Sequence, residues 1–293
     1  MITVPPSFRA MPRWWRDGQD WLEALPDLVE QQCRAWQLVP DGETAHGSNA
    51  LVLPVRRAGM PAVLRMTPPT DPIAEEIAAL DFWAGRGTVL LLDSDVSTGS
   101  TLLERLDAGR SLMSIPISQA SHELGRMMLR LAVPATSDLP STVTMITERL
   151  TSMRRDWQAL REPFPLANVI MAEQCAEELV VLPDQHAANV DLHHDQVLAG
   201  IREPWLTVDP RLARGDRAFD LARCLWTRLD ELEDDDAIHT QLTIIADAAE
   251  IDHDHARRTA IFRTVDYWLW GLGHGLSEDP VRCQRLLQAL RAR

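Results

Sequence analysis

The chain lacks lysine entirely, and this absence limits how it can bind charged groups. All 29 of its basic residues are arginine, whose planar guanidinium suits paired hydrogen bonds to carboxylates and phosphates. Acidic residues number 43, and the formal net charge is -14. Because nucleic acid and anionic membranes repel such a surface, we exclude both as main partners. A cationic ligand suits this surface better, although many cytosolic proteins are simply acidic.

Other absences narrow the class of protein further. No run approaches the ~18 apolar residues that a membrane span needs, and the first residues lack the basic and apolar regions of a secretion signal. There is no P-loop and no serine nucleophile elbow. The cysteines lie far apart and match no zinc or redox spacing, so we expect a protein of the reducing cytoplasm. They are Cys33, Cys175, Cys224 and Cys283.

The order of hydrophobic patterns predicts a small β-rich half followed by a larger helical half. We place the two lobes at residues 1–106 and 107–293. The strands expected in the first half are 50–55, 62–66, 89–92 and 100–106, and its helices are 21–33 and 72–83. The helices expected in the second half are 117–131, 143–160, 166–182, 219–232, 237–249, 254–272 and 279–291, with a hairpin at 191–208.

The segment AANVDLHHDQVLAGIREPWLTVDPRLARGDRAFDLA, residues 187–222, carries the clearest chemistry. Asp191 and Asp209 each stand at a turn beside an apolar, strand-like run, and Gln196 lies between them. Two carboxylates and an amide presented by two short strands can hold Mg²⁺ and aim a hydroxyl at a phosphate. Aspartate is also common at ordinary turns, and the spacing alone leaves both interpretations open.

The order of elements, with the segments LDFWAGRGTVLLLDSD, TLLERLD and residues 187–222, resembles the aminoglycoside phosphotransferases. The similarity is greater to their streptomycin 6-kinase and hydroxyurea phosphotransferase group. This resemblance implies an α+β, bilobal, protein-kinase-like fold. It also implies an antibiotic resistance enzyme that uses Mg²⁺ and moves the γ-phosphate of ATP or GTP to a hydroxyl of a cationic acceptor, an aminoglycoside such as streptomycin or a related aminocyclitol.

The resemblance also implies roles for single residues. Asp191 matches the catalytic aspartate that orients the attacking hydroxyl, while Asp209 and Gln196 stand at the Mg²⁺-binding positions. Arg65 occupies the position of a lysine on the nucleotide phosphates, and Glu76 matches the helix glutamate that holds it. The remaining implied residues are Gly47, Ser48 and Asn49 over the phosphates, the backbone of Glu104 to Leu106 at the adenine edge, and Asp220 as a brace of the catalytic loop.

Two features of the helical half are candidates for binding the acceptor. Asp230, Glu231 and Glu233 belong to an acidic run that would suit a polyamine sugar, although such a run is usually a solvated loop. Trp268 and Trp270 are expected to lie in the core; the alternative is that they face the acceptor. We expect neither zinc at the paired histidines His193 and His194 nor a nucleophilic role for Cys224.

Three positions depart from the pattern of the family. Arg65 replaces lysine, Gln196 replaces asparagine, and Asn189 replaces the histidine often found two residues before the catalytic aspartate. The turn over the phosphates is also poor in glycine. Two alternatives therefore remain: a catalytically impaired, kinase-like protein that binds a nucleotide or ligand, and a kinase for another metabolite such as hydroxyurea or a sugar. The acceptor, the nucleotide and the oligomeric state stay open.

Overall fold

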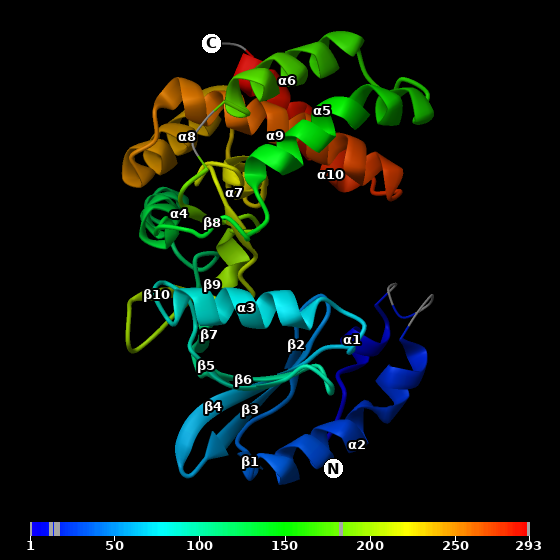
Figure 1. Cartoon of the computed structure of the whole chain (residues 1–293), viewed down its shortest axis with the longest axis vertical. Coiled ribbons are helices and arrows are strands. Elements are labelled where there is room, and N and C mark those ends of the chain that lie inside the picture. The colour runs from blue at the N-terminus through cyan, green and yellow to red at the C-terminus, as the bar shows by residue number, and fades with distance from the viewer. Residues whose placement is uncertain (1, 12–13, 15–17, 182–183, 292–293) are drawn as a thin grey trace. The chain divides into compact units, whose positions relative to one another are not determined.

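The computed structural model describes residues 2–11, 14, 18–181 and 184–291, which form two compact units (Figure 1). Unit 1 contains Met1–Asp107 together with Gly200–Arg202. Unit 2 contains Ala108–Ala199 together with Glu203–Arg293. Within the described ranges, no helix is long and apolar enough to cross a bilayer.

Unit 1 is built on an antiparallel sheet with the strand order β1-β3-β4-β6-β5, in which β2 also pairs with β3. Buried and more exposed residues alternate along most of β3, as they do in a strand with one face on a core. The β3–β4 turn has positive φ at Ala58 (51°) and Gly59 (81°), which suits the twist of a tight hairpin. The strands are β1 (Leu38–Pro40), β2 (Ala45–His46), β3 (Leu51–Arg57), β4 (Met60–Met66), β5 (Leu91–Asp95) and β6 (Ser100–Glu104).

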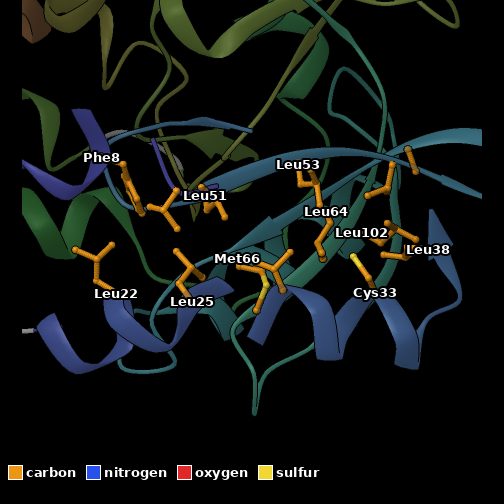
Figure 2. Close-up of a cluster of buried hydrophobic side chains, with 14 of the residues drawn as sticks. Phe8, Leu22, Leu25, Cys33, Leu38, Leu51, Leu53, Leu64, Met66 and Leu102 are labelled. Carbon is orange, nitrogen blue, oxygen red and sulfur yellow. The ribbon is translucent and has the colours of Figure 1, made fainter. Parts of the chain in front are cut away.

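The core of unit 1 lies between this sheet and helix α2 (Gln19–Ala35). Leu22 and Leu25 recur on α2 at helical spacing and belong to one hydrophobic cluster with the strand residues Leu64 and Leu102, and all four side chains are almost fully buried (Figure 2). Burying each such side chain contributes about 2 kcal/mol, so the sheet is held firmly on this face. The strand residues that alternate with these core residues point to the opposite face of the sheet, toward α3 (Ile73–Trp83).

Unit 2 is mainly helical, and its long helices pack in pairs: α4 on α8, α6 on α9, and α9 on α10 (Figure 1). Side chains cap three of them, since Ser141, Asp234 and Asp252 accept backbone N–H bonds at the starts of α5, α8 and α9. The helices are α4 (Ile117–Leu131), α5 (Thr142–Ala159), α6 (Leu166–Leu179), α7 (Leu221–Trp226), α8 (Asp235–Ala249), α9 (His253–Gly273) and α10 (Glu278–Arg291).

In unit 2 the hairpin expected at residues 191–208 forms between short strands at 197–199 and 205–207, and a second small sheet carries the segment before Asp191. β8 (Ala187–Asn189), which precedes Asp191, pairs with β11 (Leu212–Arg214). Asp209 instead follows β10 (Trp205–Thr207), which pairs with β9 (Val197–Ala199). The two aspartates therefore follow strands of different sheets, because β8 finds its partner beyond Asp209 in the sequence.

Several expected element boundaries were wrong. The helix expected over 219–232 is shorter: α7 ends at Trp226, and a 3-10 turn covers Leu229–Glu231. The buried guanidinium of Arg228, which lies between them, donates to the carbonyls of Leu112 and Ile115 and thus joins a distant segment. Strand β6 ends at Glu104 rather than 106, and β5 lies at 91–95 rather than 89–92. Helix α6 ends at Leu179, and Leu182, its expected end, lies outside the described residues.

Candidate active site

The cation predicted to hold nucleotide phosphates lies on β4 of unit 1. Arg65 is buried, and its Nη1 donates to Oε2 of Glu76 on α3 at 2.5 Å. Its Nη2 donates to Oδ1 of Asn49 at 3.3 Å. Alternation along β4 directs Ala62 and Leu64 into the α2 core and Arg65 to the α3 face. The structure thus brings together Arg65, Glu76 and Asn49, while their binding roles remain predictions.

The other nucleotide candidates of unit 1 lie at the ends of strands. Gly47 and Ser48 are exposed in the turn between β2 and β3, where Gly47 N–H donates to the carbonyl of Ala50 at 3.0 Å. Glu104 closes β6, and its carboxylate accepts bonds from the N–H of Leu90 and from Arg202, each at 2.9 Å. Its own N–H is committed to the Leu90 carbonyl at 2.9 Å. Leu106 follows as a partly buried residue outside any strand.

Asp191, the predicted catalytic residue, lies in unit 2 just beyond β8 and is partly exposed. Arg223 donates from Nη1 to its Oδ1, and Gln196 donates from Nε2 to its Oδ2 at 3.2 Å. Each carboxylate oxygen is therefore held by a different donor. A carboxylate offers about four acceptor positions, so these two donors leave room for a hydroxyl. Sequence reasoning missed Arg223, which stands 32 residues away and belongs to no motif.

The metal candidates Gln196 and Asp209 lie next to each other. The Gln196 carbonyl accepts the N–H of Val208 at 2.7 Å, and its Nε2 lies 3.5 Å from the carbonyl of Asp209. Asp209 has a φ of 51°, so the chain turns sharply there. The side-chain Oε1 of Gln196 is buried and has no hydrogen-bond partner among the described residues. A buried amide oxygen beside carboxylates fits Mg²⁺, which prefers such hard ligands.

Residues around the start of α7 support the loop that carries Asp191. Asp220 is fully buried, accepts a bond from the backbone of Leu192, and pairs with Nη2 of Arg263 at 3.3 Å. Burial raises the pKa of the Asp220 carboxyl to about 6, although Arg263 opposes the shift. Cys224 donates from Sγ to the carbonyl of Leu192 at 3.2 Å and is itself buried. Both polar groups of Leu192 are thus bound.

Asn189, which replaces the usual histidine, also orders this loop. Its Oδ1 accepts the N–H of Asp191 at 3.2 Å and the N–H of Arg211 at 3.0 Å. One amide therefore ties the segment after β8 to the segment after Asp209. Asn189 therefore supports this loop at the position where the family often has a histidine.

His194 is a buried neutral residue. It is 1% exposed, and neither ring nitrogen has a hydrogen-bond partner within the described part of the chain. Burial, with the charge of Arg228 and the neighbouring His193, lowers the pKa of His194 to about 3. Its native pKa lies below the unfolded value of about 6.5, so its contribution to stability is present above pH 6.5 and lost as the pH falls toward 3.

We expect the substitution His194→Leu to flatten this pH dependence. Between pH 7 and pH 5, wild-type protein should lose about 2 kcal/mol more unfolding free energy than the variant, because only its unfolded state gains a proton at this position. Urea unfolding at both pH values measures the difference, with the exposed His122→Leu as control. Equal losses in wild type and His194→Leu would mean that His194 takes up a proton between pH 7 and pH 5 in the native protein as it does in the unfolded chain.

The candidate acceptor residues differ in their ion pairs and in their exposure. Asp230 pairs with Arg282, and Glu231 pairs with Arg228 at 2.6 Å, while Glu233 is exposed. The aspartates that follow begin α8, so this run is partly a helix start. Trp270 is 48% exposed, and the expectation that it lies in the core was wrong. On α9 it lies two residues after Trp268, roughly half a helical turn around the axis, and so faces away from the buried side, where the ring centroids of Trp268 and Phe164 are 4.3 Å apart.

Comparison with known proteins gives consistent matches over most of the chain. The family model described as aminoglycoside/hydroxyurea antibiotic resistance kinase matches residues 35–275. Streptomycin 6-kinase of Streptomyces glaucescens is 34% identical over 286 residues, which cover 94% of this chain and 92% of that protein. Hydroxyurea phosphotransferase of Kitasatospora aureofaciens is 33% identical over 279 residues, or 90% of this chain and 78% of that protein.

A solved structure provides the comparison of folds. Aminoglycoside phosphotransferase APH(4)-Ia matches with a TM-score of 0.63 over 90% of this chain and 99% of that one. Because the sequence identity is 15%, this likeness concerns the fold alone. The α+β, protein-kinase-like fold expected from the order of the elements is confirmed.

Proposed function

The chain belongs to the aminoglycoside/hydroxyurea antibiotic resistance kinase family, and we propose that it phosphorylates a hydroxyl of an aminoglycoside or related aminocyclitol. The donor is ATP or GTP, and the product is a phosphorylated antibiotic such as streptomycin phosphate. The net charge of -14 supports a polycationic acceptor. We assign nucleotide binding to residues 1–106 and acceptor chemistry to residues 107–293.

The arrangement around Asp191 carries this proposal. Phosphoryl transfer needs a hydroxyl held in line with the γ-phosphate, and the protein supplies mainly position and charge. Arg223 and Gln196 bind different oxygens of the Asp191 carboxylate and so restrict its orientation. A hydroxyl that donates to this carboxylate is then held in one direction, and the same carboxylate can take its proton.

The remaining residues act on the nucleotide. When bound, Mg²⁺ neutralises phosphate charge, and Gln196 and Asp209 are the residues that would hold it. Arg65 binds the phosphates, and Glu76 on α3 fixes its direction. A guanidinium makes paired hydrogen bonds where lysine makes a point contact, so Arg65 replaces the usual charge with a more directional one.

A phosphate-transfer screen tests the proposal. Purified protein with Mg²⁺ and either ATP or GTP is offered streptomycin, other aminocyclitols, hydroxyurea and simple sugars, and phosphorylated product is measured by mass. We expect turnover on an aminoglycoside. Turnover on hydroxyurea alone would favour a kinase like the relative in Kitasatospora aureofaciens. Nucleotide binding without product on any acceptor would mean a silent binding protein.

Arg65 provides a separate test of the nucleotide assignment. Arg65→Met should raise the nucleotide KM about 30-fold, because hydrogen bonds to charged groups are worth roughly 1.5–3 kcal/mol. Arg65→Lys should stay within a few-fold of wild type, since it keeps the charge. Arg56→Met removes an exposed arginine from the neighbouring strand and serves as control. An unchanged nucleotide KM in Arg65→Met would refute the assignment.

A further inference from the structure

The start of α7 holds the candidate catalytic segment by bonds from three of its residues. Asp220 accepts the N–H of Leu192, and Cys224 donates to the Leu192 carbonyl. Arg223 donates to the carboxylate of Asp191. Because all three side chains come from one short stretch of chain, the direction of the Asp191 carboxylate depends on how the start of α7 is itself held.

Arg263 on α9 contacts the start of α7 in two ways. Its Nη2 donates to Oδ1 of Asp220 at 3.3 Å. Its guanidinium also lies 4.3 Å from the ring centre of Phe219, the residue before Asp220. A planar guanidinium can stack on a ring and bind a carboxylate at its edge, which the point charge of a lysine cannot reproduce. Asp220 is 2% exposed and needs a cation close by, so Arg263 fixes this part of the chain.

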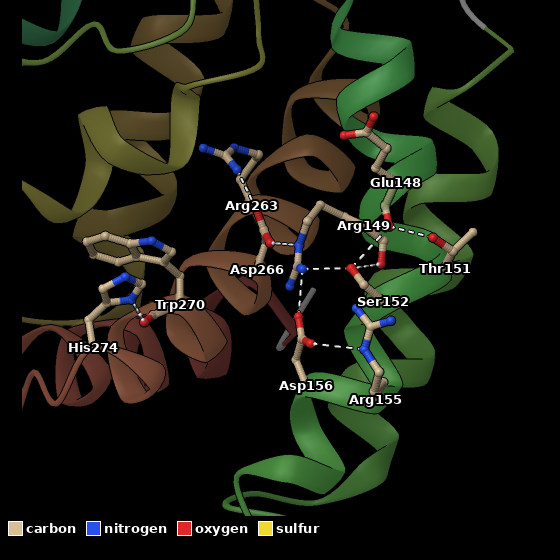
Figure 3. Close-up of polar contacts among 10 residues, drawn as sticks. All are labelled: Glu148, Arg149, Thr151, Ser152, Arg155, Asp156, Arg263, Asp266, Trp270 and His274. Atoms are coloured by element: carbon tan, nitrogen blue, oxygen red, sulfur yellow. Dashed lines mark hydrogen bonds and ion pairs between the residues drawn. The ribbon is translucent and has the colours of Figure 1, made fainter. Parts of the chain in front are cut away.

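A second buried carboxylate, Asp266, holds Arg263 in turn. Asp266 lies three residues after Arg263 on α9, and its Oδ2 accepts a bond from Nη1 of Arg263 at 2.5 Å. Its Oδ1 accepts a bond from Nε of Arg149 on α5, also at 2.5 Å. Figure 3 shows Asp266 between the two guanidinium groups. Each oxygen of Asp266 therefore binds a different arginine.

Arg149 is anchored on its own helix. Its Nη1 donates to Oγ of Ser152 and to Oδ2 of Asp156, both at 2.7 Å (Figure 3). The contacts thus form a series of alternating charges from α5 through α9 to the start of α7, which we call the charge chain. Its members are Asp156, Arg149, Asp266, Arg263 and Asp220. Because hydrogen-bonded charges in a protein interior orient one another, a change at one end alters the geometry at the other.

We propose that Arg149, Asp266 and Arg263 are positioning residues for phosphoryl transfer, which act through Asp220 on the direction of the Asp191 carboxylate. This inference rests on the proposed function and deepens it, because it extends the residues that place the hydroxyl to α5 and α9. The partners of these three residues are protein side chains. Their loss therefore lowers kcat, because the carboxylate is misplaced, and leaves the KM of nucleotide and acceptor nearly unchanged.

Steady-state kinetics of Arg149 variants test the charge chain at its outer end, where the side chain is 27% exposed. Arg149→Met should lower kcat about fivefold, well within the roughly 10²-fold that a remote misplacement can cost, with both KM values changed less than about twofold. Arg149→Lys keeps the charge and should recover most of kcat. Arg154→Met is the matched control, because it removes an arginine of the same helix that pairs with Glu173 instead. Equal kcat in Arg149→Met and Arg154→Met overturns the inference.

A double variant separates an effect transmitted along the charge chain from an independent one. Asp220→Asn interrupts the chain at its inner end, so adding Arg149→Met to it should lower kcat by less than about twofold. A further loss as large as the one in the wild-type background means that Arg149 does not act through Asp220, and it overturns the inference.

Hydrogen exchange of the Leu192 N–H, followed by NMR without nucleotide, separates this inference from the proposed function. Asp220 binds this N–H, so exchange should be about fivefold faster in Arg149→Met and in Arg263→Lys, and unchanged in Arg154→Met. Faster exchange supports the charge chain even if no acceptor is phosphorylated, a result that would count against the proposed function alone. Exchange equal to wild type in both variants overturns the inference and leaves the proposed function intact. Equal acceleration of the N–H groups of α8 would show a general loss of stability, which also overturns it.

Discussion

Asp191→Ala is expected to lower kcat for phosphoryl transfer by about 10³-fold, because a positioned carboxylate that orients and deprotonates the hydroxyl contributes roughly 10²–10⁴. Stability should change little, since Asp191 is partly exposed and the side chain of its partner Arg223 is 34% exposed. Single-turnover transfer of γ-phosphate to the acceptor found in the screen measures the first effect, and urea unfolding measures the second.

A neighbouring carboxylate provides the matched control. Asp195 lies four residues further along the same loop, and its side chain is 61% exposed. Asp195→Ala removes the same group without touching the set around Asp191, and we expect less than a twofold change in kcat. If Asp191→Ala turns over like wild type, Asp191 is not the residue that orients the hydroxyl, and the proposed mechanism is wrong.

Asp220→Ala is expected to cost about 3 kcal/mol of unfolding free energy at pH 7, near the lower limit for breaking a buried ion pair. The loss is moderated because Arg263 keeps a second partner, Asp266, at 2.5 Å. Removing the carboxylate also leaves the N–H of Leu192 without its acceptor. Since Leu192 follows Asp191 directly, kcat should fall as well. Urea unfolding and steady-state kinetics on the same preparation measure both effects.

The matched variant Asp220→Asn keeps an oxygen for the Leu192 N–H and should cost less than Asp220→Ala. Burial raises the native pKa of Asp220 to about 6, against 3.8 for the usual carboxyl. The part of its contribution that depends on protonation is thus complete below pH 3.8 and is lost as the pH rises through 6, so the neutral amide resembles the charge state of Asp220 most closely below pH 6. Asp254→Ala, at an exposed position of α9, is the control. Equal stability of Asp220→Ala and Asp254→Ala would contradict a bracing role.

Local patterns in the sequence predicted much of the architecture. The helical spacing of Leu22 and Leu25 and the alternation along β3 indicated α2 and the sheet, because such periods directly reflect which face is buried. They could not predict every strand pair. β9 and β10, which are neighbours in the sequence, form the expected hairpin, but β8 pairs with β11, which lies beyond that hairpin in the sequence. Strand partners depend on positions far apart in the chain.

The candidate site shows the same division. The sequence by itself determined which residue types are present: the carboxylates at 191 and 209 with the amide at 196, the arginine at 65 and the glutamate at 76. Only the tertiary structure decided that Arg223 binds Asp191 across 32 residues and that Arg263 joins Asp220 to Asp266. Chemistry is a property of each side chain, whereas contact depends on how distant helices and strands pack, and short-range sequence patterns do not contain that information.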